Sequence, residues 1–324
     1  MALIAQITRT GGPEVIEWVD RDLPPPGPGE VRMRTTAAGL NFIDTYHRSG
    51  LYTVPLPSGL GMEAAGVVEA VGPGVESLAA GDRVGTWAAG LGAYATERNL
   101  AAASLYRLPD AIDDETAAAS LLKGCTVEFL VERCARVQPG WTVLVHAAAG
   151  GVGLLLVQWL KHVGATVIGT VGSDAKAERA RTAGADHVLL SRQDDIAARV
   201  REITGGEGVS VSFDGVGAAT WQASLGATRR RGLIISYGNA SGPVEGVKLA
   251  ELNQHGSLFV TRPTMHHYYA TPEEHEAGSA RVFELLTAGV LRPEIGQRFA
   301  LEDVAEAHRR LEAGETQGST VLVP

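Results

Sequence analysis

The chain has 324 residues, 45% of them hydrophobic and 20% charged, and a formal net charge of −9. This length and composition fit two ordinary globular domains. The acidic balance argues against a nucleic-acid-binding protein, which usually carries a basic patch. The longest apolar run, Leu154–Leu160, is interrupted by Gln158 and is too short to span a bilayer. Two cysteines, Cys125 and Cys134, are too few for a disulfide framework or a four-thiolate zinc site. With no secretion signal at the N-terminus, we expect a cytoplasmic protein outside the membrane.

Residues 1 to about 122 are predicted to be rich in strands and turns. Val31–Thr35 alternates apolar and polar residues, as a half-buried strand does. Ala64–Val71 is predicted as a further strand, which ends at the turn Gly72-Pro73-Gly74. This first region is therefore expected to be mostly β.

From about residue 125, short apolar runs alternate with helical stretches. The predicted strands are Thr142–His146, Ala165–Val171, His187–Leu190, Val209–Phe213 and Leu233–Tyr237, and the first two predicted helices are Gly151–Val163 and Ala175–Ala183. Alternation of this kind implies a parallel, doubly wound sheet.

The last part of the chain departs from this alternation. Helices are predicted near Glu273–Ala288 and Val304–Glu312, followed by a final strand at Thr320–Val323. We expect this tail to return to the first domain, which would make that domain discontinuous.

A dinucleotide-binding motif is predicted where the first of the alternating strands meets its helix. Ala148, Gly150 and Gly153 occupy the three glycine places of the fingerprint. Gly150 lets the backbone reach a pyrophosphate, and Gly153 lets the helix pack on the strand. The first place tolerates Ala148 only if its φ stays negative. The N–H groups at the helix start can then hold phosphates.

The end of the second alternating strand decides between NAD and NADP. An NAD site usually has Asp or Glu there to bond the ribose 2′-hydroxyl, whereas no acid ends this strand. Ser173 can bond a 2′-phosphate, and Lys176 can neutralise its charge. Asp174 lies nearby, so the choice is not closed, but the pattern favours NADPH.

Seven motifs occur in order and carry a resemblance. They are NFIDTYHRSGLY (41–52), GMEAAGVVEAVG (61–72), AGDRV (80–84), LKGCTVEFL (122–130), HAAAGGVG (146–153), YGNASG (237–242) and VTRP (260–263). Over essentially its whole length the chain resembles the zinc-free, ζ-crystallin-like quinone oxidoreductases of the medium-chain dehydrogenase/reductase superfamily.

This resemblance implies an α/β architecture with two domains. Residues 1–124 and 263–324 would form a GroES-like, mostly β catalytic domain, and residues 125–262 a Rossmann domain that binds NADP. The active site would lie in the cleft between them. The resemblance also implies a homodimer, commonly paired through the Rossmann sheets.

The catalytic metal of related enzymes is predicted to be missing. The zinc alcohol dehydrogenases have a cysteine in place of Asn41 and a histidine in place of Met62. Without that thiolate and imidazole, the usual catalytic zinc site cannot form. Glu63 is then expected to be a buried, paired carboxylate, and His146 a satisfied core histidine. We predict no metal.

The resemblance also implies the site residues. Asn41, Tyr46, Tyr52 and Arg262 would line the quinone pocket, with Asn41 and Tyr46 donating to a quinone oxygen and Tyr52 stacking on the ring or closing the mouth. Asp44 would orient its neighbours. The implied cofactor contacts are Phe42, Lys123, Thr126, Ala149, Gly150, Gly151, Val152, Gly172, Ser173, Lys176, Ser191, Val216, Gly238, Asn239, Phe259, Val260 and Thr261.

Two departures from the related enzymes bear on the cofactor. They often carry a tyrosine against the adenosine where this chain has Ser191, and some carry an arginine near Gly314. Either loss would weaken NADPH binding or relax its selectivity. Arg192 is our candidate to substitute in part.

Three functions are compatible with these residues. The first is a zinc-independent NADPH:quinone reductase, because an electron-poor quinone can be reduced largely through positioning and a few hydrogen bonds. The second is an NADPH-dependent reductase of activated C=C bonds in 2-alkenals or enones. The third is a non-catalytic NADPH-binding or RNA-binding role, against which the acidic net charge argues.

Overall fold

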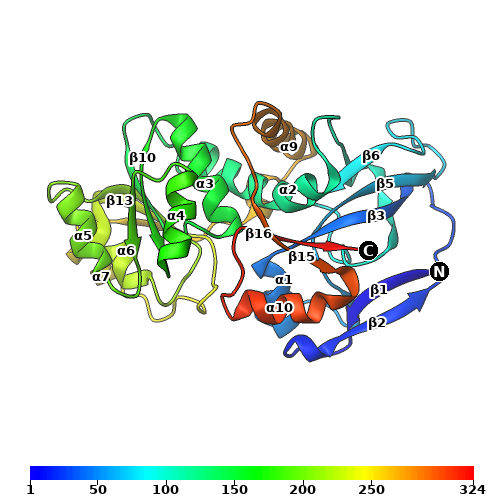
Figure 1. Ribbon diagram of the computed structural model, residues 1–324, viewed down its shortest axis with the longest axis horizontal. Coiled ribbons are helices and arrows are strands. Elements are labelled where there is room, and N and C mark those ends of the chain that lie inside the picture. The colour runs from blue at the N-terminus through cyan, green and yellow to red at the C-terminus, as the bar shows by residue number, and fades with distance from the viewer. The chain divides into compact units, whose positions relative to one another are not determined.

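The computed structural model describes all 324 residues, and the chain divides into two units (Figure 1). Unit 1 consists of Met1–Lys123, Ser279–Thr287 and Pro293–Pro324, and unit 2 of Gly124–Gly278 and Ala288–Arg292. The first division falls one residue before the predicted one. The second falls after Gly278 rather than at residue 262, because the intervening segment is bonded to unit 2. Within it, Tyr269 Oη donates to the Cys125 carbonyl at 2.8 Å, and Arg133 donates to the Tyr268 carbonyl at 3.0 Å.

Unit 1 is built mainly from strands. A three-stranded sheet has the order β2–β1–β4, and a seven-stranded sheet has the order β15–β16–β3–β5–β6–β8, with β7 paired to β3. The strands are β1 (Ala2–Ile7), β2 (Ile16–Arg21), β3 (Glu30–Leu40), β4 (Ser58–Gly59), β5 (Glu63–Val71), β6 (Arg83–Thr86), β7 (Glu97–Ala101), β8 (Tyr106–Arg107), β15 (Ile295–Ala300) and β16 (Ser319–Val323). The helices are α1 (Phe42–Ser49), α10 (Val304–Glu312), the first part of α2 (Asp114–Glu128) and the last part of α9 (Pro272–Thr287).

The C-terminal strand completes the larger sheet. β16 pairs antiparallel with β3, placing Val321 opposite Gly39, and parallel with β15. The tail therefore returns to the first unit, as the sequence predicts. Met33, Leu60, Val304 and Leu322 are buried together in one apolar cluster, and each large side chain buried in this way contributes about 1.5–3 kcal/mol. Phe42, the first residue of α1, packs against this cluster.

Unit 2 contains one sheet of six parallel strands in the order β11–β10–β9–β12–β13–β14. Numbered within the unit this is 3-2-1-4-5-6, the order of doubly wound dinucleotide-binding sheets. The elements are β9 (Thr142–Val145), α3 (Gly151–Val163), β10 (Thr166–Val171), α4 (Asp174–Thr182), β11 (His187–Leu190), α5 (Ile196–Ile203), β12 (Val209–Asp214), α6 (Trp221–Ala227), β13 (Thr228–Ser236), α7 (Leu249–Gln254), β14 (Phe259–Thr261) and α8 (Met265–Tyr268). The predicted fold class is confirmed.

The helices of unit 2 cover both faces of its sheet. In Figure 1, α3 and α4 lie on one side of the strands, and α5 and α6 lie on the other. The strands are buried on both faces, as in β12, where every residue is buried. This arrangement leaves the carboxyl ends of the strands as the edge at which ligands bind in such sheets.

Candidate active site

The loop between β9 and α3 has the geometry of a phosphate cradle. Gly150 caps α3, and its carbonyl accepts from Leu154 N at 2.9 Å. The N–H groups that open α3 therefore lie outside its own hydrogen-bond ladder. A Cβ at Gly153 would lie 2.2 Å from the Ala147 carbonyl oxygen, so only glycine fits. Ala148 keeps a negative φ, and the left-handed residue is Ala147 with φ 53. The loop thus fits a pyrophosphate.

The end of β10 fits a phosphorylated ribose. The strand ends at Val171, Gly172 has open space around it, and Ser173 caps α4 without using its side chain for the cap. No acid ends the strand, and Asp174 is the first residue of α4. Lys176 lies in the first turn of that helix. A hydroxyl and a cation are therefore offered where an NAD site would carry a carboxylate.

The segment after β11 lies beside the end of β10. Leu190 pairs with Val171, and both the N–H and the hydroxyl of Ser191 donate to the Val171 carbonyl, at 2.8 and 3.2 Å. Arg192 follows directly. Burial, and then the positive charge of Arg192, lower the pKa of Lys176. The two cations are therefore close enough to repel each other.

The remaining predicted cofactor residues of unit 2 follow its other strands. Val216 follows β12, Gly238 and Asn239 follow β13, and Thr261 ends β14. The side-chain amide of Asn239 has one orientation in which both its nitrogen and its oxygen are hydrogen-bonded. In that orientation it donates to the Gly238 carbonyl at 2.9 Å and accepts from Arg262 Nη2 at 3.1 Å. The structure therefore brings Arg262 together with a predicted cofactor contact.

Three predicted contacts lie away from these strand ends. Phe259 and Val260 are 63% and 39% exposed on β14, which is an outer strand of the sheet. Thr126 lies on α2, and its hydroxyl donates to Met265 Sδ at 3.5 Å.

In unit 1, the predicted substrate residues gather around α1. Asn41 caps the helix, which begins at Phe42. The Tyr46 ring lies 5.2 Å from that of Tyr52 in an edge contact, and 6.4 Å from that of Phe42. Tyr52 is held near the helix because its N–H donates to the Tyr46 carbonyl at 3.1 Å. Asn41 therefore lies at the start of the helix that carries Phe42 and Tyr46, whose rings form one aromatic group with Tyr52.

Glu63 organises the charged part of this group. The residue is fully buried, and its Oε2 accepts from Asn41 Nδ2 at 2.9 Å and from Lys123 Nζ at 3.0 Å, while Oε1 accepts from Leu122 N at 2.8 Å. Glu63 is thus the buried, paired carboxylate that the sequence predicts. Asn41 Nδ2 also donates to the Gly39 carbonyl at 3.3 Å, so both of its N–H groups point into the protein. A donation from Asn41 to a quinone would require one of these bonds to open.

Asp44 is a second buried carboxyl. Its Oδ2 accepts from Asn41 N at 2.8 Å and from Tyr94 Oη at 2.6 Å, and its Oδ1 has no hydrogen-bond partner. Burial raises the pKa of Asp44 to about 7, against the effect of the two hydrogen bonds and of Lys123. Asp44 thereby fixes the Asn41 backbone, in agreement with its predicted orienting role.

The side chains of Asn41, Glu63 and Lys123 do not fit a zinc ion. Lys123 presents an ammonium group to Glu63, and a protonated ammonium has no lone pair to give to a metal. No group of three or more His, Cys, Asp or Glu side chains that could hold a metal occurs in the chain. We therefore derive no step through zinc.

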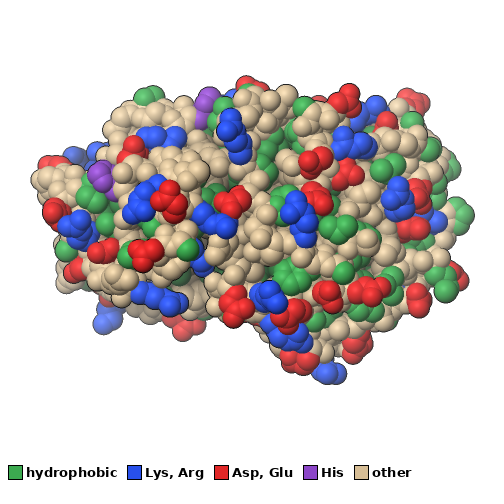
Figure 2. Space-filling view, viewed as in Figure 1, with side chains coloured by type: hydrophobic (Ala, Val, Ile, Leu, Met, Phe, Trp, Pro, Cys, Tyr) green, Lys and Arg blue, Asp and Glu red, His purple; other side chains and the backbone are tan.

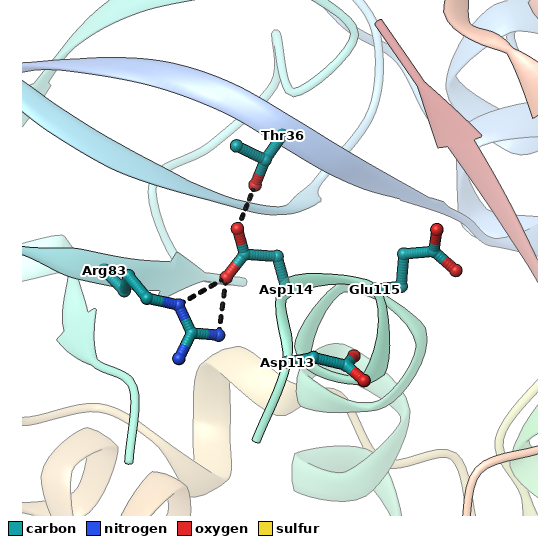
Figure 3. A pocket seen from close by; sticks show the side chains of 5 residues that line it. All are labelled: Thr36, Arg83, Asp113, Asp114 and Glu115. Carbon is teal, nitrogen blue, oxygen red and sulfur yellow. Dashed lines mark hydrogen bonds and ion pairs between the residues drawn. The ribbon is translucent and has the colours of Figure 1, made fainter. Parts of the chain in front are cut away.

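A surface pocket of unit 1 lies elsewhere, lined by Thr36, Arg83, Asp113, Asp114 and Glu115 (Figure 3). Asp114 is held by Arg83 at 2.7 Å and by Thr36 at 2.6 Å. Asp113 accepts from Thr116 N, and Glu115 pairs with Arg298. Because each carboxylate has an internal partner, this cluster anchors the start of α2, and we place no ligand there.

Asp214, Ser224 and Tyr94 are absent from the sequence-based predictions although they support the site. Asp214 ends β12, and its carboxylate accepts from the N–H groups of Val216 and Gly217, both at 3.0 Å. One signal was available, because an acid followed by Gly-Val-Gly ends a buried strand in the sequence. Ser224 and Tyr94 carried no local signal, since Asp44 lies 50 residues from Tyr94, and His146 and Asp214 lie 78 and 10 residues from Ser224.

Together, the doubly wound sheet, the glycine cradle and the separate β-rich unit define a dinucleotide-dependent oxidoreductase. Two family models match the chain: the alcohol dehydrogenase GroES-like domain over residues 27–110 and the zinc-binding dehydrogenase over residues 151–275. The chain belongs to the quinone oxidoreductases of the medium-chain dehydrogenase/reductase superfamily.

Three similar proteins indicate the range of this family. A quinone oxidoreductase of Pseudomonas aeruginosa is 51% identical, and the match covers 100% of both chains. The crystal structure of Escherichia coli quinone oxidoreductase complexed with NADPH is 47% identical with a TM-score of 0.96, over 99% of this chain and 100% of that one. A 2-haloacrylate reductase of Burkholderia is 44% identical, over 100% of this chain and 99% of its own.

Proposed function

We propose that the protein is an NADPH-dependent, zinc-independent quinone oxidoreductase. The observation that carries the proposal is the full-length similarity to quinone oxidoreductases, one of which is complexed with NADPH in its crystal structure. The glycine cradle after β9 and the absence of an acid at the end of β10 support the same cofactor.

The residues divide the work between the two units. In unit 2, the start of α3 would hold the pyrophosphate, and Ser173 with Lys176 would hold the 2′-phosphate. NADPH supplies a hydride when bound. In unit 1, Tyr46 and Tyr52 are the proposed donors and ring contacts for the quinone. Lys123 and Glu63 fix Asn41 beside them.

The test is an assay of NADPH oxidation in the presence of EDTA. The acceptors are benzoquinone, phenanthrenequinone and a 2-alkenal, each repeated with NADH. We expect rapid, EDTA-insensitive oxidation of NADPH by the quinones. Loss of activity in EDTA would contradict the zinc-independent reaction, and turnover of the alkenal alone would contradict the quinone assignment.

The second candidate, reduction of an activated C=C bond, is supported by the 44% identity to a 2-haloacrylate reductase. A haloacrylate or an enone is electron-poor, like a quinone, and needs the same kind of hydride donor. Adding 2-chloroacrylate to the acceptor panel separates the two candidates, because a quinone reductase should leave it unreduced.

NADPH selectivity is proposed to depend on Lys176 together with Arg192. Arg192→Ala should weaken NADPH binding about tenfold and leave NADH binding within about twofold, because only NADPH carries the phosphate that a second cation would contact. Binding of both nucleotides is measured by isothermal titration.

Arg181→Ala is the matched control for this prediction. Arg181 lies on the same helix as Lys176, is 56% exposed and pairs with Glu178 at 3.6 Å. Its replacement should leave both affinities unchanged. An equal loss of NADH affinity in Arg192→Ala would contradict the proposed phosphate contact.

A homodimer paired through unit 2 is proposed from the free edge of its sheet. β14 ends the sheet, and Phe259 and Val260 on it are exposed. An open strand edge with exposed apolar side chains is a surface suited to pairing. We expect light scattering to give twice the mass of one chain for the unaltered protein and the mass of one chain for Phe259→Asp. The control Val71→Asp, at an exposed apolar residue of unit 1, should remain dimeric.

The setting of the protein is proposed to be the cytoplasm. Neither Cys125 nor Cys134 forms a disulfide, which suits a reducing compartment. No helix is both long and apolar enough to cross a bilayer.

On the face seen in Figure 2, basic and acidic side chains are interspersed, which argues against the RNA-binding alternative because that would favour a continuous basic patch.

A further inference from the structure

A chain of buried polar side chains runs beneath the cofactor loops of unit 2. His146 Nδ1 lies 3.0 Å from Thr170 Oγ1, and His146 Nε2 lies 3.1 Å from Ser224 Oγ. Ser224 Oγ donates in turn to Asp214 Oδ2 at 2.8 Å. All four residues are at most 2% exposed. These hydrogen bonds link the carboxyl ends of β10, β9 and β12, and Ser224, which lies on α6, joins His146 to Asp214.

The direction of every hydrogen bond in this chain follows from Asp214. An ionised carboxylate only accepts, so Ser224 gives it its one hydrogen. Ser224 must then accept from His146, which places the ring hydrogen on Nε2. Nδ1 is left as an acceptor for the Thr170 hydroxyl. Burial lowers the pKa of His146, so the neutral ring that this arrangement needs is the favoured one.

Both ends of the chain reach the loops assigned to NADPH. At one end, the Thr170 carbonyl accepts from Ala148 N at 3.0 Å, within the glycine cradle. At the other end, Asp214 holds the N–H groups of Val216 and Gly217 and the Thr220 hydroxyl.

The loop after β12 then supports the loop after β13. The Val216 carbonyl accepts from Ser241 N and from Ser241 Oγ, both at 2.8 Å. Gly217 has φ 94, and a Cβ there would lie 2.4 Å from the Gly242 carbonyl oxygen. The two loops are therefore packed without room to adjust independently.

We propose that His146, Ser224 and Asp214 are positioning residues for NADPH, and that they set the relative geometry of the loops after β9, β10, β12 and β13. None of these three residues is among those proposed to contact the quinone. Loss of their hydrogen bonds should therefore weaken cofactor binding and leave the handling of the quinone intact. This inference rests on the proposed NADPH-dependent function.

Ser224→Ala breaks this series of hydrogen bonds at its centre. The substitution leaves His146 Nε2 without an acceptor and removes one donor from Asp214. We expect the Kd for NADPH, measured by isothermal titration, to rise at least tenfold. At saturating NADPH, kcat and the KM for benzoquinone should stay within twofold of the unaltered enzyme.

Ser212→Ala is the matched control. Ser212, on β12, is also fully buried, and its hydroxyl lies 2.7 Å from Thr228 Oγ1, which donates to the Ser224 backbone carbonyl and not to the Ser224 hydroxyl. Its replacement should lower the melting temperature about as much as Ser224→Ala and leave the Kd unchanged. His146→Gln, whose amide can still donate to Ser224, should bind NADPH within about threefold of the unaltered chain.

The outcomes separate this inference from the proposed function. The positioning role is overturned if Ser224→Ala binds NADPH as tightly as the unaltered protein. It is also overturned if Ser212→Ala loses as much NADPH affinity as Ser224→Ala. In either case the proposed function stands. If the unaltered chain does not bind NADPH, the proposed function fails, and the inference fails with it.

Discussion

Replacing Glu63 by alanine should lower the free energy of unfolding by about 3–5 kcal/mol, the range found when one partner of a buried ion pair is removed. The reason lies in what stays behind. Lys123, whose side chain is 5% exposed, would keep an ammonium group with no carboxylate. The Asn41 amide and the Leu122 N–H would each lose an acceptor, and a buried unsatisfied donor costs about 1–3 kcal/mol. The measurement is urea-induced unfolding.

Glu69→Ala is the control for this prediction. Glu69 lies on the same strand, β5, but its side chain is 37% exposed, and it pairs at 2.8 Å with Arg34, whose side chain is 48% exposed. Exposed pairs contribute about 0–1 kcal/mol, so this variant should unfold close to the unaltered chain. Similar losses in the two variants would contradict the view that burial makes the Glu63 pair special.

The double variant Glu63→Met/Lys123→Met separates the ion pair from the charge left behind. Removing both charges leaves no uncompensated ammonium, and similar-sized apolar residues often replace a buried pair at little cost. We expect the double variant to be more stable than Glu63→Ala by at least about 2 kcal/mol. An additive loss would instead mean that the two side chains act independently.

Unit 2 could be predicted closely from the sequence because its signals are local. α3 begins at Gly151 and ends at Val163, and β11 runs from His187 to Leu190, both as the sequence predicts. α3, for example, combines a buried apolar run with a glycine at each end. The glycine places of the cradle were also readable, because spacing alone fixes them.

Unit 1 was less readable because its contacts join distant parts of the chain. β3 extends to Leu40 beyond the predicted Thr35, because Ala37 and Ala38 pair with the small residues of β5. No local pattern marks these alanines as strand residues, since alanine is weak in strands. The same holds for the Glu63 cluster, in which Lys123 comes from 60 residues further along the chain. The type of each residue was visible, but the partner that gives it a role was not.

Asp44 is expected to make the stability of the protein fall as pH rises from 5 to 8. Its pKa in the folded chain is raised from 3.8 to about 7, with burial as the largest cause. Below the unfolded pKa both states are protonated. Between the two pKa values the unfolded chain has released the proton that the folded chain still holds, so each pH unit costs about 1.4 kcal/mol. Above the folded pKa the whole contribution, roughly 4 kcal/mol, is lost.

Asp44→Asn isolates this contribution because the amide mimics the neutral carboxyl and does not titrate. Its oxygen can still accept from Tyr94 Oη and from Asn41 N, which bond Oδ2 in the unaltered chain. Relative to Asp44→Asn, the unaltered protein should lose about 3 kcal/mol of unfolding free energy between pH 5 and pH 8. Urea titrations at each pH give the difference directly.

Asp186→Asn is the control, because the pKa of Asp186 is lowered in the folded chain whereas that of Asp44 is raised. The hydrogen bond and charge of Lys161 help to hold the pKa of Asp186 below its usual value, although burial acts against them. Its stabilising contribution is therefore present throughout pH 5–8 and is lost only at lower pH, so the difference from the unaltered chain should be flat in this window. If the Asp44→Asn difference were also flat, Asp44 would be ionised in the folded chain throughout this window, because only then do the folded and unfolded states bind equal numbers of protons. A difference that kept falling by about 1.4 kcal/mol per pH unit up to pH 8 would instead mean that the folded chain holds Asp44 neutral even there.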